Sequence, residues 1–149
     1  NAIYVLWDDL VLNNPPLAPS GGYVQNFDNC PLSAGGATAC VIFQWDNADH
    51  FGGGIDSFDF QVVLYANGNI LMNYGSGNPE TGSGSTSGIE NSAASVGLTH
   101  VCNSVGSLPA FSSTLFTPLP PAISLNKTVA IDTGVEFCSL DESVSITPG

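Results

Sequence analysis

The acidic residues of segment 46–56 are the side chains in this sequence best suited to binding a metal ion. Asp46, Asn47, Asp49 and Asp56 surround three consecutive glycines. Carboxylate and amide oxygens on a bendable backbone are ligands that Ca²⁺ prefers, although the spacing here is not that of an EF-hand loop. We therefore expect calcium as a cofactor, held by these four residues. The alternative is that the acids only keep a loop soluble.

The other chemistry-bearing residues do not form a pattern typical of an enzyme. A serine or cysteine nucleophile needs a histidine base and a carboxylate within reach, and the two histidines are His50, in the acidic segment, and His100, on a predicted strand. Glu90 and Glu136 are candidates by type for glycoside hydrolysis, but nothing in the sequence sets their separation. The glycine-rich stretch 82–88 lacks the lysine and helix of a phosphate-binding loop. We expect no catalytic residues.

Aromatic side chains offer a second kind of site, a platform for a sugar ring or another ligand. Trp7 and Trp45 alternate with strand neighbours, so we expect both in the core. Tyr65 lies on the more polar face of a predicted hairpin, where we expect it to be exposed, and Phe51 lies in the acidic segment. Tyr65 and Phe51 are therefore the ligand-binding candidates.

The cysteines indicate an oxidising compartment. Cys30, Cys40, Cys102 and Cys138 include no C-x-x-C pair and no histidine at zinc-finger spacing. An even number without metal spacing favours two disulfides, as in secreted proteins. Three pairings are possible, of which we predict Cys30–Cys40 and Cys102–Cys138. Four buried free thiols are the alternative.

The stretch FDFQVVLYANGNILMNYG, residues 58–75, predicts a β-hairpin with one apolar face. A three-residue loop, Ala66 to Gly68, puts a glycine where the chain needs a positive φ angle. A two-residue loop would shift the pairing by one and split the apolar residues between the faces. With the longer loop, one face collects residues that would build a core wall: Phe58, Phe60, Val62, Leu64, Ile70, Met72 and Tyr74.

Short alternating segments separated by turn residues recur along the rest of the chain, and no long window shows a helical period free of glycine and proline. This pattern predicts an all-β fold, an antiparallel β-sandwich of the jelly-roll kind with little or no helix. A chain of 149 residues suits a single domain over residues 1–149. The further strand candidates are 2–12, 22–27, 39–47, 95–102 and 127–140.

Composition restricts the partners. One Lys or Arg stands against 13 Asp and Glu, for a formal net charge of −12. Such a surface repels phosphate backbones and anionic membranes, so we expect neither nucleic acid nor membrane as a partner. No apolar run is long enough to span a bilayer. The first residue is Asn and no basic-then-apolar leader follows, so we expect a monomeric piece of a larger product.

Four motifs follow one another along the chain: WDDL at 7–10, FQW at 43–45, FQVVLYANGNILMNYG at 60–75 and GIENSAASVGLTHVCN at 88–103. This series resembles an accessory β-sandwich domain of secreted, multidomain bacterial proteins, notably extracellular proteases of the subtilisin-like class. The long Gly-Ser stretch before GIEN and the Cys30–Cys40 loop depart from the family pattern. The surface of this chain is therefore expected to differ from that of its relatives.

The resemblance implies a non-catalytic module of a secreted bacterial hydrolase, in particular a serine protease. Its partner would be the parent catalytic domain, which it docks to and stabilises, or an insoluble protein or polysaccharide substrate. A second hypothesis is a free-standing adhesin or lectin-like sandwich that binds glycans with calcium. Both hypotheses place the domain outside the cell.

Overall fold

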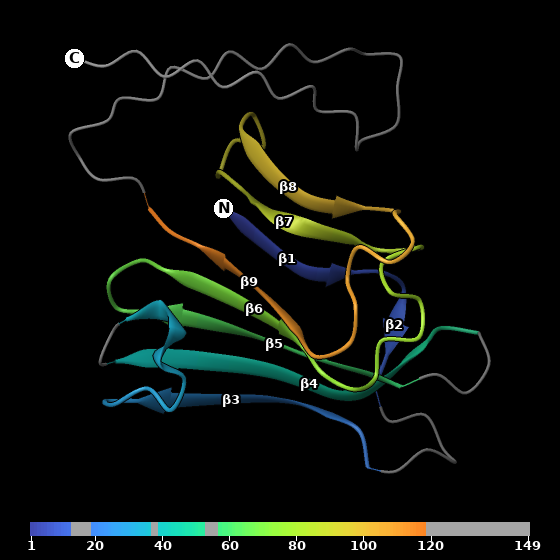
Figure 1. Ribbon diagram of the computed structural model, residues 1–149, viewed down its shortest axis with the longest axis horizontal. Coiled ribbons are helices and arrows are strands. Elements are labelled where there is room, and N and C mark those ends of the chain that lie inside the picture. Colours follow the sequence, from blue (N-terminus) through green and yellow to red (C-terminus); the bar gives the residue numbers. More distant parts are fainter. Residues whose placement is uncertain (13–18, 37–38, 53–56, 119–149) are drawn as a thin grey trace.

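The computed structural model describes residues 1–12, 19–36, 39–52 and 57–118, and Figure 1 shows their arrangement. Within these residues the chain forms nine strands and one 3₁₀ turn, and no helix has the length and hydrophobicity needed to cross a membrane. The elements are β1 (Ala2–Trp7), β2 (Leu10–Val11), β3 (Gly21–Phe27), η1 (Ser33–Gly35), β4 (Cys40–His50), β5 (Phe58–Tyr65), β6 (Ile70–Tyr74), β7 (Thr86–Glu90), β8 (Gly97–Cys102) and β9 (Ser112–Phe116).

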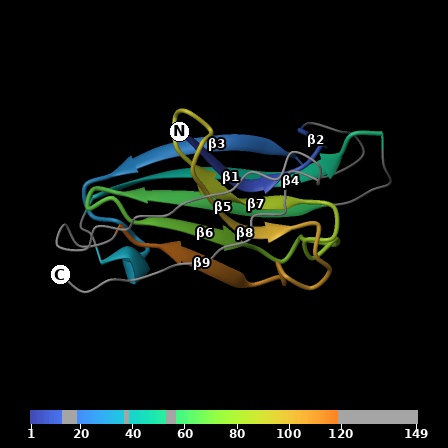
Figure 2. The same ribbon diagram turned by 90° about the horizontal axis from the view of Figure 1, so that it is seen from above.

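The strands form two antiparallel sheets. The smaller sheet has the order β1-β7-β8, and the larger has the order β2-β4-β5-β6-β9, with β3 also paired to β4. The smaller sheet lies against one face of the larger one, and Figure 2 shows the same two layers from above. The predicted all-β fold with two antiparallel sheets, a disulfide and little helix is confirmed. The predicted strand at 127–140 lies outside the described residues.

The hairpin of β5 and β6 has the register that the sequence predicts. Phe60 pairs with Tyr74 and Val62 with Met72. Gly68 has a φ of 87°, and its amide donates to the carbonyl of Tyr65 at 2.9 Å. The three-residue loop is therefore confirmed, and it directs the apolar face of the hairpin toward the smaller sheet.

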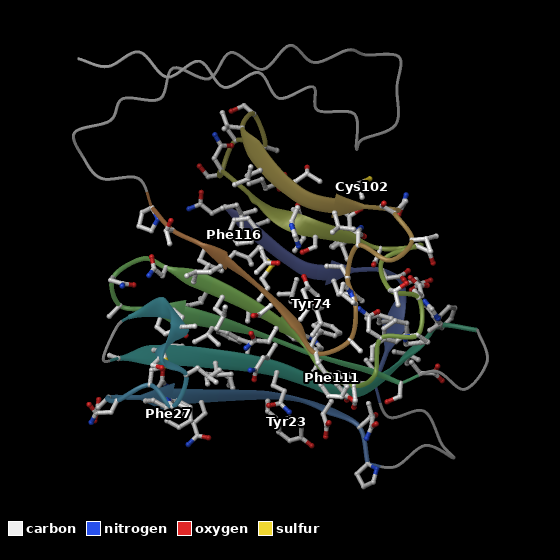
Figure 3. All side chains as sticks on the ribbon, in the orientation of Figure 1. Tyr23, Phe27, Tyr74, Cys102, Phe111 and Phe116 are labelled. Atoms are coloured by element: carbon white, nitrogen blue, oxygen red, sulfur yellow. A yellow bond between two sulfur atoms is a disulfide. The ribbon has the colours of Figure 1, made fainter. Side chains whose placement is uncertain are left out.

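Tyr74 joins the two sheets through a buried hydroxyl group. Its ring lies between the sheets in Figure 3, surrounded by the main core. The hydroxyl donates to the carbonyl oxygen of Val5 in β1 at 2.7 Å and lies 2.7 Å from Ser87 Oγ in β7. Burial raises the pKa of Tyr74 to about 12, because the phenolate would lose its hydration. The main core consists of Val5, Leu6, Ala48, Phe58, Phe60, Val62, Met72, Tyr74, Val101 and Leu108.

The outer face of the larger sheet is also covered, by the loop that precedes β4. The disulfide Cys30–Cys40 holds this loop, and Val63, Tyr65 and Leu71 are buried beneath it. Tyr65 is 5% exposed, and its hydroxyl donates to the carbonyl of Leu32 at 2.8 Å. The expected exposure of Tyr65 is therefore wrong. The face that is more polar in the hairpin sequence is a second core, because a distant loop packs on it.

The predicted pairing of the cysteines holds for the residues that the structure describes. Cys30 and Cys40 are bonded, and Cys102 is also in a disulfide. Cys138, the expected partner of Cys102, lies outside the described residues. None of the described cysteines is a free thiol.

The two tryptophans, Trp7 and Trp45, differ in how far they are buried. Trp45 stacks on Phe60 with ring centroids 5.0 Å apart, as expected for a residue that packs against the core. Trp7 is 66% exposed, so its expected place in the core is wrong. The register of β1 against β7 shifts between Tyr4 and Trp7, where β1 holds one extra residue. Such a bulge turns the following side chain to the opposite face.

We expect Tyr74→Phe to destabilise the fold by about 1–3 kcal/mol, because it leaves buried acceptors without their donor. The raised pKa means that Tyr74 contributes stability below pH 10, and this contribution is lost as the pH rises toward 12. Urea unfolding at pH 7 and between pH 9 and 12 measures both effects. Tyr23→Phe, at a residue that is 55% exposed, is the control. Equal unfolding midpoints for the two variants would contradict the role of the hydroxyl.

Replacing Cys30 and Cys40 together by alanine tests the second core. The bond closes a loop with a sequence separation of 10, so its loss should lower the free energy of unfolding by about 3 kcal/mol. Amide exchange at Val63 and Leu71 should accelerate more than exchange at Met72, which faces the other core. Uniform acceleration across both faces would show that the loop does not cover a separate core.

Candidate functional site

Three of the four predicted calcium ligands, Asp46, Asn47 and Asp49, lie in a strand rather than in a loop. The sequence predicts a loop from Asp46 onward, but β4 continues to His50 and pairs there with β2. Asp46 and Asn47 lie where the β4–β5 register shifts, between Trp45 and Ala48. Asp49 is fully buried within β4 and has interactions of its own. Asp56, the fourth predicted ligand, lies outside the described residues.

Asn47 and Asp46 make contacts that hold the start of β5. Asn47 has a φ of 51° at an irregularity in the β4–β5 pairing, and its amide donates to Asp59 Oδ1 at 2.9 Å. Ser57 Oγ donates to Asn47 Oδ1 at 2.8 Å, so this oxygen already has a partner. Burial, together with the neighbouring charge of Asp59, raises the pKa of Asp46. These contacts connect β4 to the start of β5 and to the residue that precedes it.

A different group of metal-binding residue types is assembled instead, from Asp8, His50 and Glu80. Each offers one ligand atom, and these atoms lie within 4.8 Å of one another. His50 Nε2 is 3.1 Å from Asp8 Oδ2 and 2.5 Å from Glu80 Oε1. All three side chains are partly buried. We call this group the Asp8–His50–Glu80 cluster.

Backbone contacts orient both carboxylates of the cluster. Asp8 Oδ1 accepts a hydrogen bond from the amide of Asp9 at 2.7 Å, which leaves Oδ2 toward His50. Glu80 Oε2 accepts from the amide of Gly84 at 3.0 Å, which leaves Oε1 toward His50. In each case one oxygen is fixed by the chain and the other faces the imidazole.

Strand pairing and an aromatic contact position the imidazole itself. The β2–β4 pairing sets Leu10 opposite His50, and the amide of Phe51 donates to the carbonyl of Asp9 at 2.8 Å. The His50 ring meets the ring of Phe58 edge to face, with centroids 4.7 Å apart. Phe58 is fully buried, so the imidazole rests on the main core. The geometry of the cluster therefore depends on the packing of the whole sandwich.

The charge around the cluster is negative. The one Lys or Arg of the chain is Lys127, which lies outside the described residues. The connection that carries Glu80 also holds two buried side-chain oxygens without a hydrogen-bond partner among the described residues, Asn78 Oδ1 and Ser85 Oγ. The segment between β6 and β7 therefore contains two side-chain oxygens that its own turns do not use as hydrogen-bond acceptors.

Exposed apolar side chains lie at the same end of the sandwich. Strands β1, β4, β6 and β8 all finish at this end, as Figure 1 shows. We call it the loop end and define it by residues 8–9, 51–52, 75–85 and 103–111. Its most exposed large apolar residues, with the adjoining Trp7, are Trp7 (66%), Phe51 (70%), Val105 (81%) and Phe111 (84%). Phe51, a ligand-binding candidate from the sequence, is thus exposed, and Tyr65 is not.

His100 and Glu90, both considered for catalysis, have structural contacts. His100 Nε2 lies 2.7 Å from Thr114 Oγ1, beside the ring of Phe116, and burial lowers its pKa. Glu90 accepts a hydrogen bond from the hydroxyl of Tyr4 at 2.5 Å. His100 lies on a strand, β8, as predicted, and has a hydrogen-bond partner there. Glu136, the second acid considered, lies outside the described residues.

The fold and site define a class of protein: a disulfide-bonded antiparallel sandwich with exposed aromatic side chains and a carboxylate-containing cluster at one end. Disulfides are typical of extracellular-type modules. The model of the family described as NIDO related matches residues 1–133, and the chain belongs to this family. Its disulfide and its family are both consistent with an extracellular location. Nothing in the match ties the chain to subtilisin-like proteases in particular. No curated protein and no solved structure matches it.

Asp46→Asn should raise the melting temperature at neutral pH. The raised pKa means that the native state holds this proton more tightly than the unfolded chain. The resulting stability is present at low pH and is lost as the pH rises through the native pKa. The gain from the substitution should therefore disappear near pH 3. Asp28→Asn, in an exposed loop position, is the control, and an equal gain there would show that only net charge matters.

Proposed function

We propose that this chain is a non-catalytic accessory module of a secreted multidomain protein, and that it binds its partner through the loop end. The match to the NIDO-related family supports an extracellular-type accessory module. The single structural observation that carries the binding proposal is the high exposure of large apolar side chains on or beside connections at one end of the sandwich, namely Trp7, Phe51, Val105 and Phe111. Connections held by a rigid scaffold are where binding residues concentrate.

The exposed side chains at the loop end are of the kinds that supply binding energy. Large aromatic residues provide most of the energy in many interfaces. Trp7 adjoins Asp8, and Phe51 adjoins His50. The loop end therefore offers aromatic faces beside carboxylates. This combination suits a partner with apolar groups and hydrogen-bond donors.

The class of host protein follows from the resemblance of the four sequence motifs. A secreted bacterial hydrolase of the serine-protease class is the host that we propose. Its catalytic domain, or the insoluble protein or polysaccharide that it degrades, is the partner. A net charge of −12 disfavours acidic partners and leaves neutral or basic ones.

The contacts of the two histidines support a role without catalysis. His50 faces the carboxylates of Asp8 and Glu80, and His100 faces the hydroxyl of Thr114. A serine or cysteine mechanism instead needs a histidine between a nucleophile and a carboxylate. Binding rather than bond cleavage is thus the function that these contacts favour.

A second candidate function is calcium-dependent glycan binding. The observation in its favour is that exposed Trp7 and Phe51 directly adjoin two members of a carboxylate-containing cluster. Sugar rings stack on aromatic faces of this kind, and a nearby cation can bind sugar hydroxyls. Binding of this type would disappear when calcium is removed, which distinguishes it from the first proposal.

Serine substitutions at Phe51 and Phe111 test the loop end. We expect the wild-type chain to be retained on insoluble collagen, chitin or cellulose, or to bind the catalytic domain encoded in the same reading frame. Each substitution should weaken that binding at least about tenfold, as for a residue at the centre of an interface. Tyr23→Ser and Val24→Ser, at exposed positions of β3, are matched controls that should bind as the wild type does.

Two results would overturn the proposal. One is an absence of binding to every one of these probes; the other is an equal loss of binding in the β3 variants. Binding on a glycan array that EDTA abolishes and calcium restores would favour the second candidate instead.

A further inference from the structure

We propose that the Asp8–His50–Glu80 cluster is a binding site for a divalent transition-type metal ion, with Zn²⁺ as the best fit. The proposal concerns a structural site and goes beyond the binding role of the loop end. It rests on three ligand atoms from three separate segments that converge within 4.8 Å.

The contacts at His50 Nε2 favour a metal over hydrogen bonds alone. This nitrogen can donate one hydrogen at most, yet two carboxylate oxygens lie close to it, Asp8 Oδ2 at 3.1 Å and Glu80 Oε1 at 2.5 Å. A metal ion accepts a lone pair from all three atoms at once. Ligand atoms about 2.0–2.1 Å from a tetrahedral Zn²⁺ lie roughly 3.3 Å apart. The two distances at His50 Nε2 would each need to lengthen by less than about 1 Å to reach that spacing.

The surrounding contacts hold these ligands in the way that metal sites require. Backbone amides of Asp9 and Gly84 fix the second oxygen of each carboxylate. The edge of Phe58 supports the imidazole from the core. Contacts of this kind orient ligands and tune metal affinity. The two backbone hydrogen bonds use the other oxygen of each carboxylate. The three proposed ligand atoms therefore remain available to bind the ion.

The ligand set selects the class of metal. One imidazole nitrogen with two carboxylate oxygens suits Zn²⁺ and related ions, whereas Ca²⁺ prefers six to eight oxygen ligands. This differs from the calcium expected at Asp46, Asn47, Asp49 and Asp56. Three protein ligands on a partly exposed site also leave a coordination position for water or a partner's oxygen.

The cluster joins two of the three described connections between the sheets to the end of β4. Asp8 lies between β1 of the smaller sheet and β2 of the larger one, and Glu80 lies between β6 and β7. His50 is the last residue of β4. A bound ion would tie these two crossings together, so metal binding should stabilise the folded chain by an amount that grows with the logarithm of its affinity.

Titration of the untagged, metal-stripped chain of residues 1–149 tests the site. We expect one Zn²⁺ per chain by calorimetry, a higher melting temperature with Zn²⁺, and binding of Ca²⁺ at least about 100-fold weaker. Bound Co²⁺ should show visible absorption bands that report its coordination. His50→Gln and Glu80→Gln should each weaken Zn²⁺ binding at least about 100-fold. His100→Gln and Glu90→Gln are matched controls that should bind as the wild type does.

Gly84→Ala provides a variant that keeps all three ligands. A Cβ atom at Gly84 would lie 2.9 Å from both oxygens of the Glu80 carboxylate, which would have to move. We expect binding about 10–100-fold weaker, with an unchanged circular dichroism spectrum that shows an intact fold. The proposal is overturned if the wild type binds neither Zn²⁺ nor Co²⁺ at one per chain, if His50→Gln and His100→Gln bind equally, or if Ca²⁺ binds more tightly than Zn²⁺.

Discussion

Burial of the β5–β6 hairpin on both faces is the constraint on which the rest of the structure depends. One face packs against the smaller sheet and the other against the disulfide-held loop. Tyr74 is central to the first face, because its hydroxyl bonds to both β1 and β7 across the sandwich. Tyr65 has the matching role on the second face, where its hydroxyl bonds to Leu32. A chain with few charged residues thus builds two cores from one pair of strands.

The antiparallel arrangement explains why chemistry gathers at one end. Strands β1, β4, β6 and β8 finish together, so the connections that follow them are neighbours although they are far apart in sequence. The same end carries the exposed aromatic side chains and the Asp8–His50–Glu80 cluster. A rigid double core supports these connections, which allows short and glycine-rich segments to hold defined side-chain positions.

Strand β4 changes how the acidic segment 46–56 is interpreted, because it places His50 of this segment in the Asp8–His50–Glu80 cluster. In the sequence, segment 46–56 resembles a loop with calcium ligands. In the structure, β4 extends into this segment as far as His50, so Asp46, Asn47 and Asp49 are strand residues. His50 is thereby directed to Asp8 and Glu80, which are 42 and 30 residues away. An imidazole with two carboxylates favours a different class of ion from an all-oxygen set.

The sequence by itself determined the features that depend on near neighbours. The period of two along 58–75 and the glycine at position 68 define the hairpin register, and the short separation of Cys30 and Cys40 favours the pairing that the structure shows. Only the tertiary structure decided the exposure of Trp7, the burial of Tyr65 and the composition of the cluster. A bulge in β1, a loop packed over the hairpin and the meeting of three distant segments produce these features. Such long-range contacts leave no local pattern, because each depends on how separate elements pack.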